Sequence, residues 1–306
     1  MADNQSIRPG DDPPAGKPAL FVTRFAPSPT GRLHRGNAFS ALTAFTAARR
    51  NGGRFLLRLE DIDTARCRPE YSEAALEDLA WLGLSWEEPV RRQSQHRSDY
   101  EDALDTLARA GLLYRCFRTR SELAVQAQSA PHGPQEPFIG GPLTPSEEAS
   151  RLAAGQAFAW RLSLDAARRQ LAGFDRLTFL ETGAGPQGET GWCAASPDLS
   201  GDIVIARKDV GVAYHLAVVA DDALQGVTHV IRGNDLFEAT HIQRLLQVLL
   251  GFPAPAYQHH PLLAGPDGRR YAKRDRSETL AEIRKSGVSA ADLRRQLGFA
   301  SLDLIE

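Results

Sequence analysis

The stretch of sequence that decides the fold is "RFAPSPTGRLHRGN", residues 24–37. It follows a short apolar run over 19–25 and precedes a segment, 37–50, in which apolar residues recur at helical spacing among alanines. A second apolar run, 54–59, comes after Asn-Gly-Gly. The order strand, glycine-bearing loop, helix and strand is typical of a parallel β-α-β unit, so we expect an α/β fold.

The loop in this stretch fits two different roles. Pro-Ser-Pro-Thr-Gly is common in surface turns, and a lone histidine such as His34 is more often structural than catalytic. At the carboxyl edge of a parallel sheet, however, a helix N-terminus binds phosphates. There Gly36 would let the backbone approach a phosphate, and His34 could donate a hydrogen bond to it. The rest of the chain has to distinguish the two roles.

The composition predicts a soluble, cytoplasmic protein. Its 306 residues carry 36 Lys and Arg against 38 Asp and Glu, so nucleic-acid binding would require a local basic face. The three cysteines, Cys67, Cys116 and Cys193, are spaced for neither a disulfide framework nor a Cys-x-x-Cys metal motif. Residues 1–18 are polar and rich in Pro and Gly, which predicts a disordered leader rather than a signal peptide. No apolar run reaches the length of a membrane span.

The middle of the chain differs in character from its two ends. Residues 129–145 contain five prolines and 182–191 are rich in glycine, which indicates an inserted, less regular module. The regular pattern then resumes, with strands predicted over 201–205, 214–220 and 228–231 and a helix over 239–250. We divide the chain into a leader (1–18), a first half of the α/β domain (19–112), an α+β insertion (113–195), a second half (196–260) and a basic loop with a helical C-terminal segment (261–306).

Three groups of polar residues accompany the loop. Glu60 ends the second predicted strand within an acidic tetrad, where a carboxylate can bind a ribose, a metal-phosphate or an amino group, although such strand ends are often only solvated. Residues 218–222 (VVADD) are read as a strand that delivers two carboxylates to the same edge, and Arg232 follows, able to bind a carboxylate bidentately. The basic loop 265–274 holds Lys273, one of only four lysines.

In this order the motifs resemble the class I glutamyl-tRNA synthetase family, over roughly residues 21–277. The opening stretch is similar to the family's signature with its HIGH-type motif, and "LRLEDID" to its second-strand motif. "WLGLSWEE", "YHLAVVADD" and "THVIRGND" have close family counterparts, and "RRYAKR" occupies the place of KMSKS, with Lys273 at its functional lysine. Ser28 and Glu60 favour the glutamyl over the glutaminyl branch. The resemblance implies a class I synthetase catalytic domain with a Rossmann-like parallel sheet.

The resemblance also implies a site for L-glutamate and ATP. Activation joins a substrate carboxylate to the α-phosphorus of ATP and expels pyrophosphate, so no protein nucleophile is needed. ATP is expected to bring Mg²⁺ on its phosphates as a substrate metal. The family pattern implies a catalytic role for His34, Gly36 and Lys273, with ATP bound by these three and Asn37. It implies a glutamate pocket formed by Arg24, Phe25, Ala26, Pro27, Ser28, Glu60, Tyr214 and Arg232.

Only about thirty residues follow Lys273, where a full glutamyl-tRNA synthetase continues into a helical anticodon-binding domain. We therefore expect no such domain, and the shorter form resembles the glutamyl-queuosine tRNA(Asp) synthetase branch of the family. That branch activates glutamate without tRNA and places it on the queuosine base of tRNA(Asp). This is the main prediction, for a monomer with no membrane partner. Two alternatives stay open: a short synthetase that charges the 3′ end of tRNA(Glu), and an inactive paralogue that binds tRNA or a nucleotide.

The sequence departs from the family pattern at three places. Family members often hold zinc in the insertion with a Cys-x-Cys pair and a later Tyr and Cys, but here Arg118 stands two residues after Cys116, and 138–142 replace the later pair. One cysteine cannot complete a tetrahedral zinc site, so we expect no bound zinc. Arg35 replaces the usual aliphatic residue of the HIGH-type motif, and Ala272 replaces the small hydroxyl residue before the functional lysine. Either change could slow activation or alter loop closure.

Overall fold

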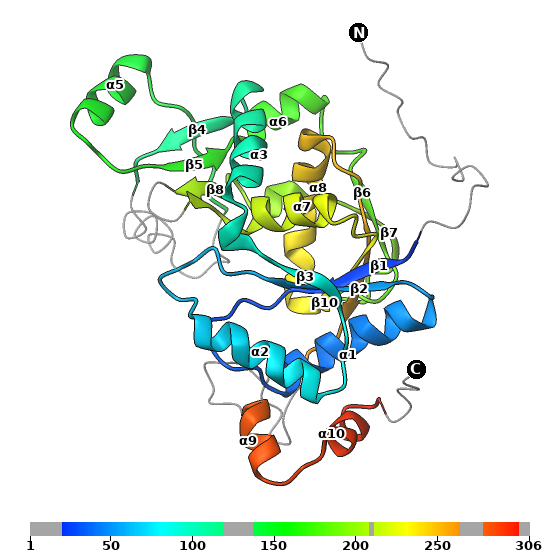
Figure 1. The fold of residues 1–306 in the computed structure, drawn as a ribbon. Helices are drawn as coiled ribbons and strands as arrows, with labels where there is room; N and C mark the ends of the chain where they lie inside the picture. Colours follow the sequence, from blue (N-terminus) through cyan, green and yellow to red (C-terminus); the bar gives the residue numbers. More distant parts are fainter. Residues whose placement is uncertain (1–19, 119–136, 208–210, 264–277, 300–306) are drawn as a thin grey trace, which may run out of the picture.

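A computed structural model of the chain describes residues 20–118, 137–207, 211–263 and 278–299 (Figure 1). The predicted leader, Ala272 and Lys273 lie outside these described residues. Within them, no helix combines the length and the apolar character needed to cross a membrane.

The first half of the α/β domain forms the parallel unit that the opening stretch predicts. Strand β1 (Val22–Phe25) pairs in parallel with β2 (Arg54–Leu59), and helix α1 (Arg35–Arg50) connects them. Helix α2 (Pro69–Trp81) then leads to β3 (Glu87–Arg92), which extends the sheet in the order β1-β2-β3. The predicted β-α-β unit is confirmed, with the helix beginning two residues earlier than expected.

A second, mostly parallel sheet has the order β10-β11-β6-β7. Strands β10 (His229–Gly233) and β11 (Ala256–His260) are joined through α8 (Phe237–Leu250), and β11 pairs in parallel with β6 (Thr178–Glu181). Strand β7 (Gly191–Ala194) closes the edge antiparallel to β6.

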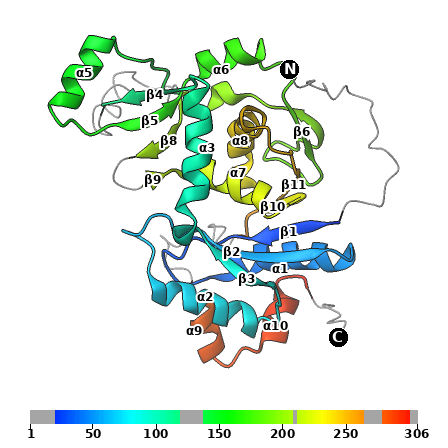
Figure 2. The ribbon, with the colours of Figure 1, turned by 45° about the horizontal axis from the view of Figure 1, so that its top comes forward.

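The two parallel sheets meet along β1 and β10, as Figure 2 shows. The backbone N–H of Thr228, just before β10, donates to the carbonyl oxygen of Val22 in β1 at 2.9 Å. The carboxyl ends of β1, β2 and β10 therefore lie at one edge, which is where ligands bind in parallel α/β sheets.

A separate four-stranded sheet is antiparallel. Its order is β4 (Leu113–Cys116), β5 (Ala159–Leu162), β8 (Val204–Arg207) and β9 (Gly211–Val212). Strands β8 and β9 follow residue 195, whereas β6, which precedes it, joins β11. Strand pairing thus groups the chain differently from the predicted division at 113 and 195, and that division stays a prediction. The other described helices and short 3-10 turns are η1 (Gln93–Gln95), α3 (Arg97–Arg109), α5 (Pro145–Ala153), α6 (Leu164–Leu171), η2 (Pro197–Leu199), η3 (Asn234–Leu236), α9 (Leu280–Lys285) and α10 (Ala290–Gln296).

One predicted strand is wrong. Residues 214–220 form the start of helix α7 (Tyr214–Leu224) and not a strand. Every residue from Leu216 to Asp222 is buried. A helix buried on all sides reads as an unbroken apolar run, which cannot be told from a buried strand by periodicity.

Candidate functional site

The N-terminus of α1 carries the histidine of the opening stretch. His34 is the N-cap residue: its Nδ1 accepts a hydrogen bond from the Gly36 backbone N–H at 3.1 Å, and its own backbone N–H donates to Asn37 Oδ1 at 3.1 Å. The structural role considered above is therefore present. Because Nδ1 is an acceptor, the ring proton lies on Nε2, the nitrogen able to donate to an anion. His34, Gly36 and Asn37 line a cavity of about 570 Å³.

The same cavity gathers the predicted glutamate pocket. Its wall includes all eight of the predicted residues, namely Arg24, Phe25, Ala26, Pro27, Ser28, Glu60, Tyr214 and Arg232. They come from the ends of β1, β2 and β10 and the first residue of α7, so segments more than 200 positions apart converge.

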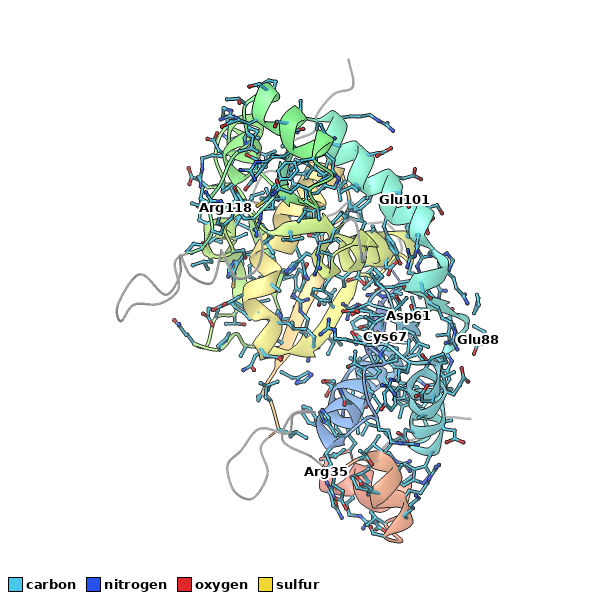
Figure 3. All side chains as sticks on the ribbon, turned by 90° about the vertical axis from the view of Figure 1, so that its left-hand side faces the viewer. Arg35, Asp61, Cys67, Glu88, Glu101 and Arg118 are labelled. Atoms are coloured by element: carbon cyan, nitrogen blue, oxygen red, sulfur yellow. The ribbon has the colours of Figure 1, made fainter. Side chains whose placement is uncertain are left out.

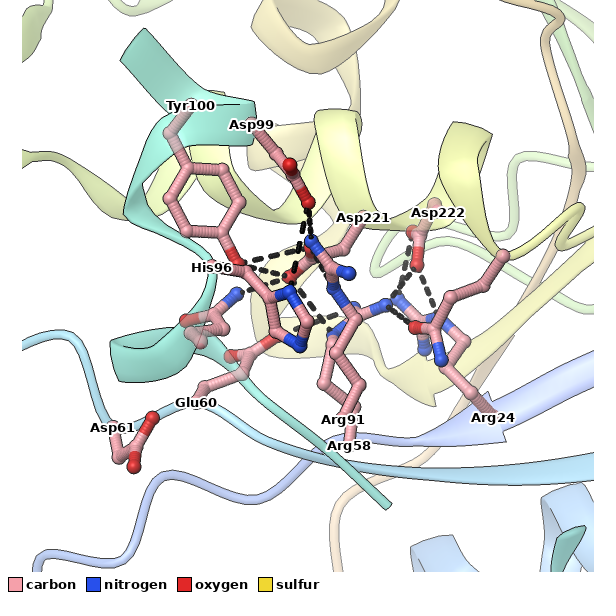
Figure 4. A network of polar contacts seen from close by, with 12 residues as sticks. Arg24, Arg58, Glu60, Asp61, Arg91, His96, Asp99, Tyr100, Asp221 and Asp222 are labelled. Carbon is pink, nitrogen blue, oxygen red and sulfur yellow. Dashed lines mark hydrogen bonds and ion pairs between the residues drawn. The ribbon is translucent and has the colours of Figure 1, made fainter. Parts of the chain in front are cut away.

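Arg24 lies in a buried ion-pair network, shown in Figure 4. Its Nε and Nη2 donate to the two carboxylate oxygens of Asp222 at 3.0 and 3.2 Å. Arg58, fully buried, donates to the same carboxylate from Nη1 at 2.8 Å and to Glu60 Oε1 from Nη2 at 3.3 Å. Burial raises the pKa of Glu60, and the charges of Arg58 and Arg24 oppose that rise. Two pocket residues are thus held by partners outside the predicted set.

Asp221 ties this network to the elements on its other side. It accepts hydrogen bonds from Arg91 Nε at 2.6 Å, from Gln93 Nε2 at 2.7 Å and from the Tyr100 hydroxyl at 2.9 Å. Its oxygen lies 3.5 Å from Arg58 Nε. Two adjacent carboxylates, Asp221 and Asp222, therefore connect helix α7 to β2, β3 and α3. The sequence pattern predicted both on a strand, whereas they lie on a helix.

Arg232 is buried without a carboxylate partner among the described residues. Its Nε donates to His259 Nε2 at 3.1 Å, its Nη1 to Gln243 Oε1 at 2.9 Å and its Nη2 to Thr240 Oγ1 at 2.8 Å. All three acceptors are neutral. One N–H on each terminal nitrogen is outside these bonds, since a guanidinium has five. Arg232 therefore keeps both charge and donors for an anion in the cavity.

Tyr214 lines the cavity and is 38% exposed. Desolvation of its hydroxyl raises the pKa of the phenol, so the hydroxyl is protonated at neutral pH and can donate a hydrogen bond.

A larger cavity of about 740 Å³ adjoins the first and shares Ser28, Glu60 and Tyr214 with it. Its remaining wall is rich in arginine and includes two phenylalanines. These residues are Arg66, Arg118, Arg161, Arg207, Phe117 and Phe158.

Arg35 lies beside the C-terminal helices, as Figure 3 shows. Its Nη1 donates to Gln296 Oε1 at 2.8 Å, and its Nη2 lies 3.6 Å from Glu278 Oε2. The unusual residue of the HIGH-type motif therefore contacts α10 and the segment before α9.

The expected place of a family zinc site is occupied by arginine and aromatic side chains. The guanidinium carbons of Arg161 and Arg118 lie 4.3 and 5.6 Å from the centroid of the Phe138 ring. Asp202 accepts a hydrogen bond from the Tyr114 hydroxyl at 2.8 Å. In the described part of the chain, no group of three or more His, Cys, Asp or Glu side chains could hold a metal ion. The absence of zinc from the protein itself stays a prediction.

Sequence reasoning missed the residues that hold the pocket from behind. Asp221 and Asp222 were singled out, but as strand-end carboxylates rather than as partners of buried arginines. Glu181 and His259, which stand behind Arg232, carried no signal, because they meet only through the pairing of β6 with β11.

The chain is similar to known proteins along most of its length. The chain matches the family described as tRNA synthetases class I (E and Q), catalytic domain, over residues 21–301. It is 47% identical over 293 residues to the glutamyl-Q tRNA(Asp) synthetase of Rhodobacter capsulatus, a match that covers 91% of this chain and 100% of that relative. It is 37% identical to the glutamate–tRNA ligase of Parasynechococcus marenigrum, over 89% of this chain and 56% of that relative.

A solved structure is also similar. The glutamate tRNA ligase of Elizabethkingia meningosepticum, in complex with its amino acid, matches with a TM-score of 0.69 and 28% identity over 83% of this chain. This chain spans 52% of that structure. The resemblance inferred from the motifs is confirmed, and the higher identity, together with full coverage of the relative, is on the glutamyl-Q side. By the family model and by the identity to its relatives, the chain belongs to the class I (E and Q) tRNA synthetases and, within them, to the glutamyl-Q tRNA(Asp) synthetase family.

Proposed function

We propose that this chain activates L-glutamate with ATP, without tRNA, and transfers the glutamyl group to the queuosine base of tRNA(Asp). The observation that carries the proposal is the single cavity that joins a buried arginine lacking a carboxylate partner in the described chain, Arg232, to the N-terminus of α1. One part suits a dicarboxylic amino acid, and the other suits the phosphates of ATP.

Three residues of the predicted pocket act directly on glutamate in the first step. Arg232 binds the side-chain carboxylate of glutamate, Glu60 accepts from the α-ammonium, and Tyr214 closes the pocket with its hydroxyl. The α-carboxylate oxygen then attacks the α-phosphorus of ATP, forming a mixed anhydride, and pyrophosphate leaves. The reaction requires no protein nucleophile, because the substrate carboxylate is the attacking group.

The phosphate end of the cavity stabilises the charge that develops in this step. His34 donates from Nε2 to a phosphate oxygen, and the partial positive charge of the α1 N-terminus favours the phosphate group. The backbone N–H groups of Gly36 and Asn37 are directed to the His34 side chain, so they hold the ring in place rather than bind phosphate. Lys273, outside the described residues, is proposed to neutralise phosphate charge in the transition state. Mg²⁺ accompanies ATP as part of the substrate.

The larger cavity is proposed to receive the acceptor nucleoside. It shares Ser28, Glu60 and Tyr214 with the activation cavity, so a group bound there lies next to the adenylate. Arginines bind phosphates, and phenylalanines such as Phe117 and Phe158 stack on bases. A nucleophilic group of the acceptor attacks the glutamyl carbonyl carbon, and AMP leaves.

The decisive experiment is ATP–pyrophosphate exchange over the twenty amino acids, followed by transfer to tRNA. We expect exchange with glutamate alone and in the absence of tRNA. Labelled glutamate should then appear on tRNA(Asp) only when the tRNA contains queuosine, and should resist a treatment that removes the 3′-terminal nucleoside. Label on the 3′ end of tRNA(Glu) would favour a short synthetase instead, and absence of exchange would favour an inactive paralogue.

The role of Arg232 is tested separately. Because it is proposed to bind the substrate carboxylate, Arg232→Ala should raise the KM for glutamate in the exchange assay and leave the KM for ATP near the wild-type value. An unchanged glutamate requirement would contradict the pocket as drawn.

A further inference from the structure

Three buried side chains form a line across the second parallel sheet. Glu181 ends β6, His259 lies in β11 and Arg232 lies in β10, on neighbouring strands. Arg232 and His259 are directly paired in the ladder, and Tyr257, two residues before His259, is paired with Glu181. Side chains two positions apart on a strand share one face, so the pairing brings the three groups together.

The hydrogen bonds along this line have a definite direction. Arg232 Nε donates to His259 Nε2 at 3.1 Å, so that ring nitrogen must carry a lone pair. The ring proton then lies on Nδ1, which is 2.5 Å from Glu181 Oε2 and donates to it. The other oxygen, Glu181 Oε1, accepts from the backbone N–H groups of His259 at 2.9 Å and Gly183 at 2.8 Å. One carboxylate therefore sets the tautomer of the histidine that faces Arg232.

The three side chains of the line are deeply buried, which affects their charges. Glu181, His259 and Arg232 are 1%, 2% and 6% exposed. Burial lowers the pKa of His259, so the ring between the two charges is neutral at pH 7. Burial raises the pKa of Glu181, but hydrogen bonds from the His259 side chain and backbone outweigh this and keep the carboxyl ionised. The neutral His259 ring therefore separates the Glu181 carboxylate from the Arg232 guanidinium.

No carboxylate of the described residues is hydrogen-bonded to Arg232. Its other acceptors, Gln243 and Thr240, are neutral, and its guanidinium carbon lies 5.4 Å from the Tyr257 ring centroid. The nearby His215 is also neutral, since burial and Arg232 lower its pKa to about 4. A carboxylate placed directly on Arg232 by the protein would compete with the substrate, whereas a neutral imidazole orients the guanidinium without doing so.

We propose that Glu181 and His259 are positioning residues that orient Arg232 and so determine the preference for a substrate carboxylate over a carboxamide. This inference rests on the proposed role of Arg232 in binding the glutamate side chain. The carboxylate accepts from both remaining N–H groups of the fork, while a carboxamide offers one oxygen and turns an NH₂ donor toward a guanidinium that only donates.

The substitution Glu181→Gln tests the line by reversing it. The amide oxygen is held by the two backbone N–H groups, so the NH₂ group faces His259 Nδ1. The ring must then accept on Nδ1 and carry its proton on Nε2, where it meets the Arg232 N–H donor. We expect at least a tenfold rise in the KM for glutamate in pyrophosphate exchange, no comparable change in the KM for ATP, and weaker discrimination against glutamine. The control is His229→Gln, a histidine at the other end of β10 that should leave both KM values unchanged.

A second measurement is independent of activity and reads the wild-type protein directly. In the wild-type protein with ¹⁵N-labelled histidine, the His259 ring should give the signature of a neutral Nδ1–H tautomer across pH 6–8, with His259→Gln identifying the signal. A neutral Nε2–H tautomer or a charged ring in the wild type would overturn the proposal. So would a Glu181→Gln enzyme whose KM values for glutamate and ATP rise together, since that is the effect of a merely structural tie. If the wild type shows no glutamate exchange at all, the proposed function fails, while the tautomer still decides the arrangement of the line.

Discussion

Asp222 offers the sharpest test of how the pocket is held together. Its carboxylate accepts from Arg24 at 3.0 and 3.2 Å and from Arg58 at 2.8 Å, and its side chain is only 9% exposed. The substitution Asp222→Asn keeps the shape but removes the charge. Arg58 retains Asp221 and Glu60, whereas Arg24 loses its carboxylate partner. Breaking a buried ion pair from one side costs about 3–5 kcal/mol, so we expect a loss of that size in the free energy of unfolding.

The matched control is Asp198→Asn. Asp198 also pairs with an arginine, Arg168, but both side chains are about half exposed, at 54% and 45%. Exposed pairs contribute about 0–1 kcal/mol, so this variant should unfold close to the wild type in urea. Asp222→Asn should in addition raise the KM for glutamate, because Arg24 loses its carboxylate partner and Arg58, which holds Glu60, loses one of its own.

The pH dependence of the free energy of unfolding gives an independent check that the ionised Asp222 stabilises the fold. Arg24 and Arg58 overcome the effect of burial and hold the pKa of Asp222 below its ordinary value. A carboxylate with a depressed pKa in the folded state contributes stability above its unfolded pKa, about 4, and loses it as the pH falls through the folded value. The difference between wild type and Asp222→Asn should therefore be constant near neutrality and shrink only in acid. Equal unfolding free energies for Asp222→Asn and Asp198→Asn at pH 7 would refute this reasoning.

Three further outcomes are expected. Lys273→Ala should suppress adenylate formation more than glutamate binding, since the lysine is proposed to act on phosphate charge; equal losses in exchange rate and in calorimetric glutamate affinity would remove that assignment. Metal analysis of the purified protein should find no stoichiometric zinc. One zinc per chain would contradict the expectation that Arg118 and residues 138–142 replace the zinc ligands of the family. Tyr114→Phe leaves Asp202 without one of its buried donors and should lower the free energy of unfolding by about 1–3 kcal/mol in urea, with no change in the KM for glutamate.

Local patterns predicted the parts of the fold that depend on local forces. The strand, loop, helix and strand around the opening stretch follow from alternating and helical apolar spacing, and they appear as β1, α1 and β2. The family motifs also identified residues that the fold collects around one cavity. Neither the β-α-β unit nor the motif residues required knowledge of which distant strands pair.

What the sequence could not predict depends on burial and on long-range pairing. Helix α7 was read as a strand because burial on every side erases its periodicity. Glu181 and His259 are 78 positions apart and meet through one strand pair, β6 with β11, in a region whose glycines and prolines indicated only irregular structure. A lone glutamate and a lone histidine carry no signal until that pairing is known.

The pairing of β6 with β11 also limits how this protein could be taken apart or recombined. A designer who exchanged residues 113–195 for the equivalent segment of a relative would transplant Glu181 along with the exchanged module, and with it the partner that sets the histidine behind Arg232. The segment predicted as an insertion is therefore not interchangeable as a unit. A chimera should therefore keep glutamate selectivity only where the donor segment supplies an acidic side chain at the end of its corresponding strand.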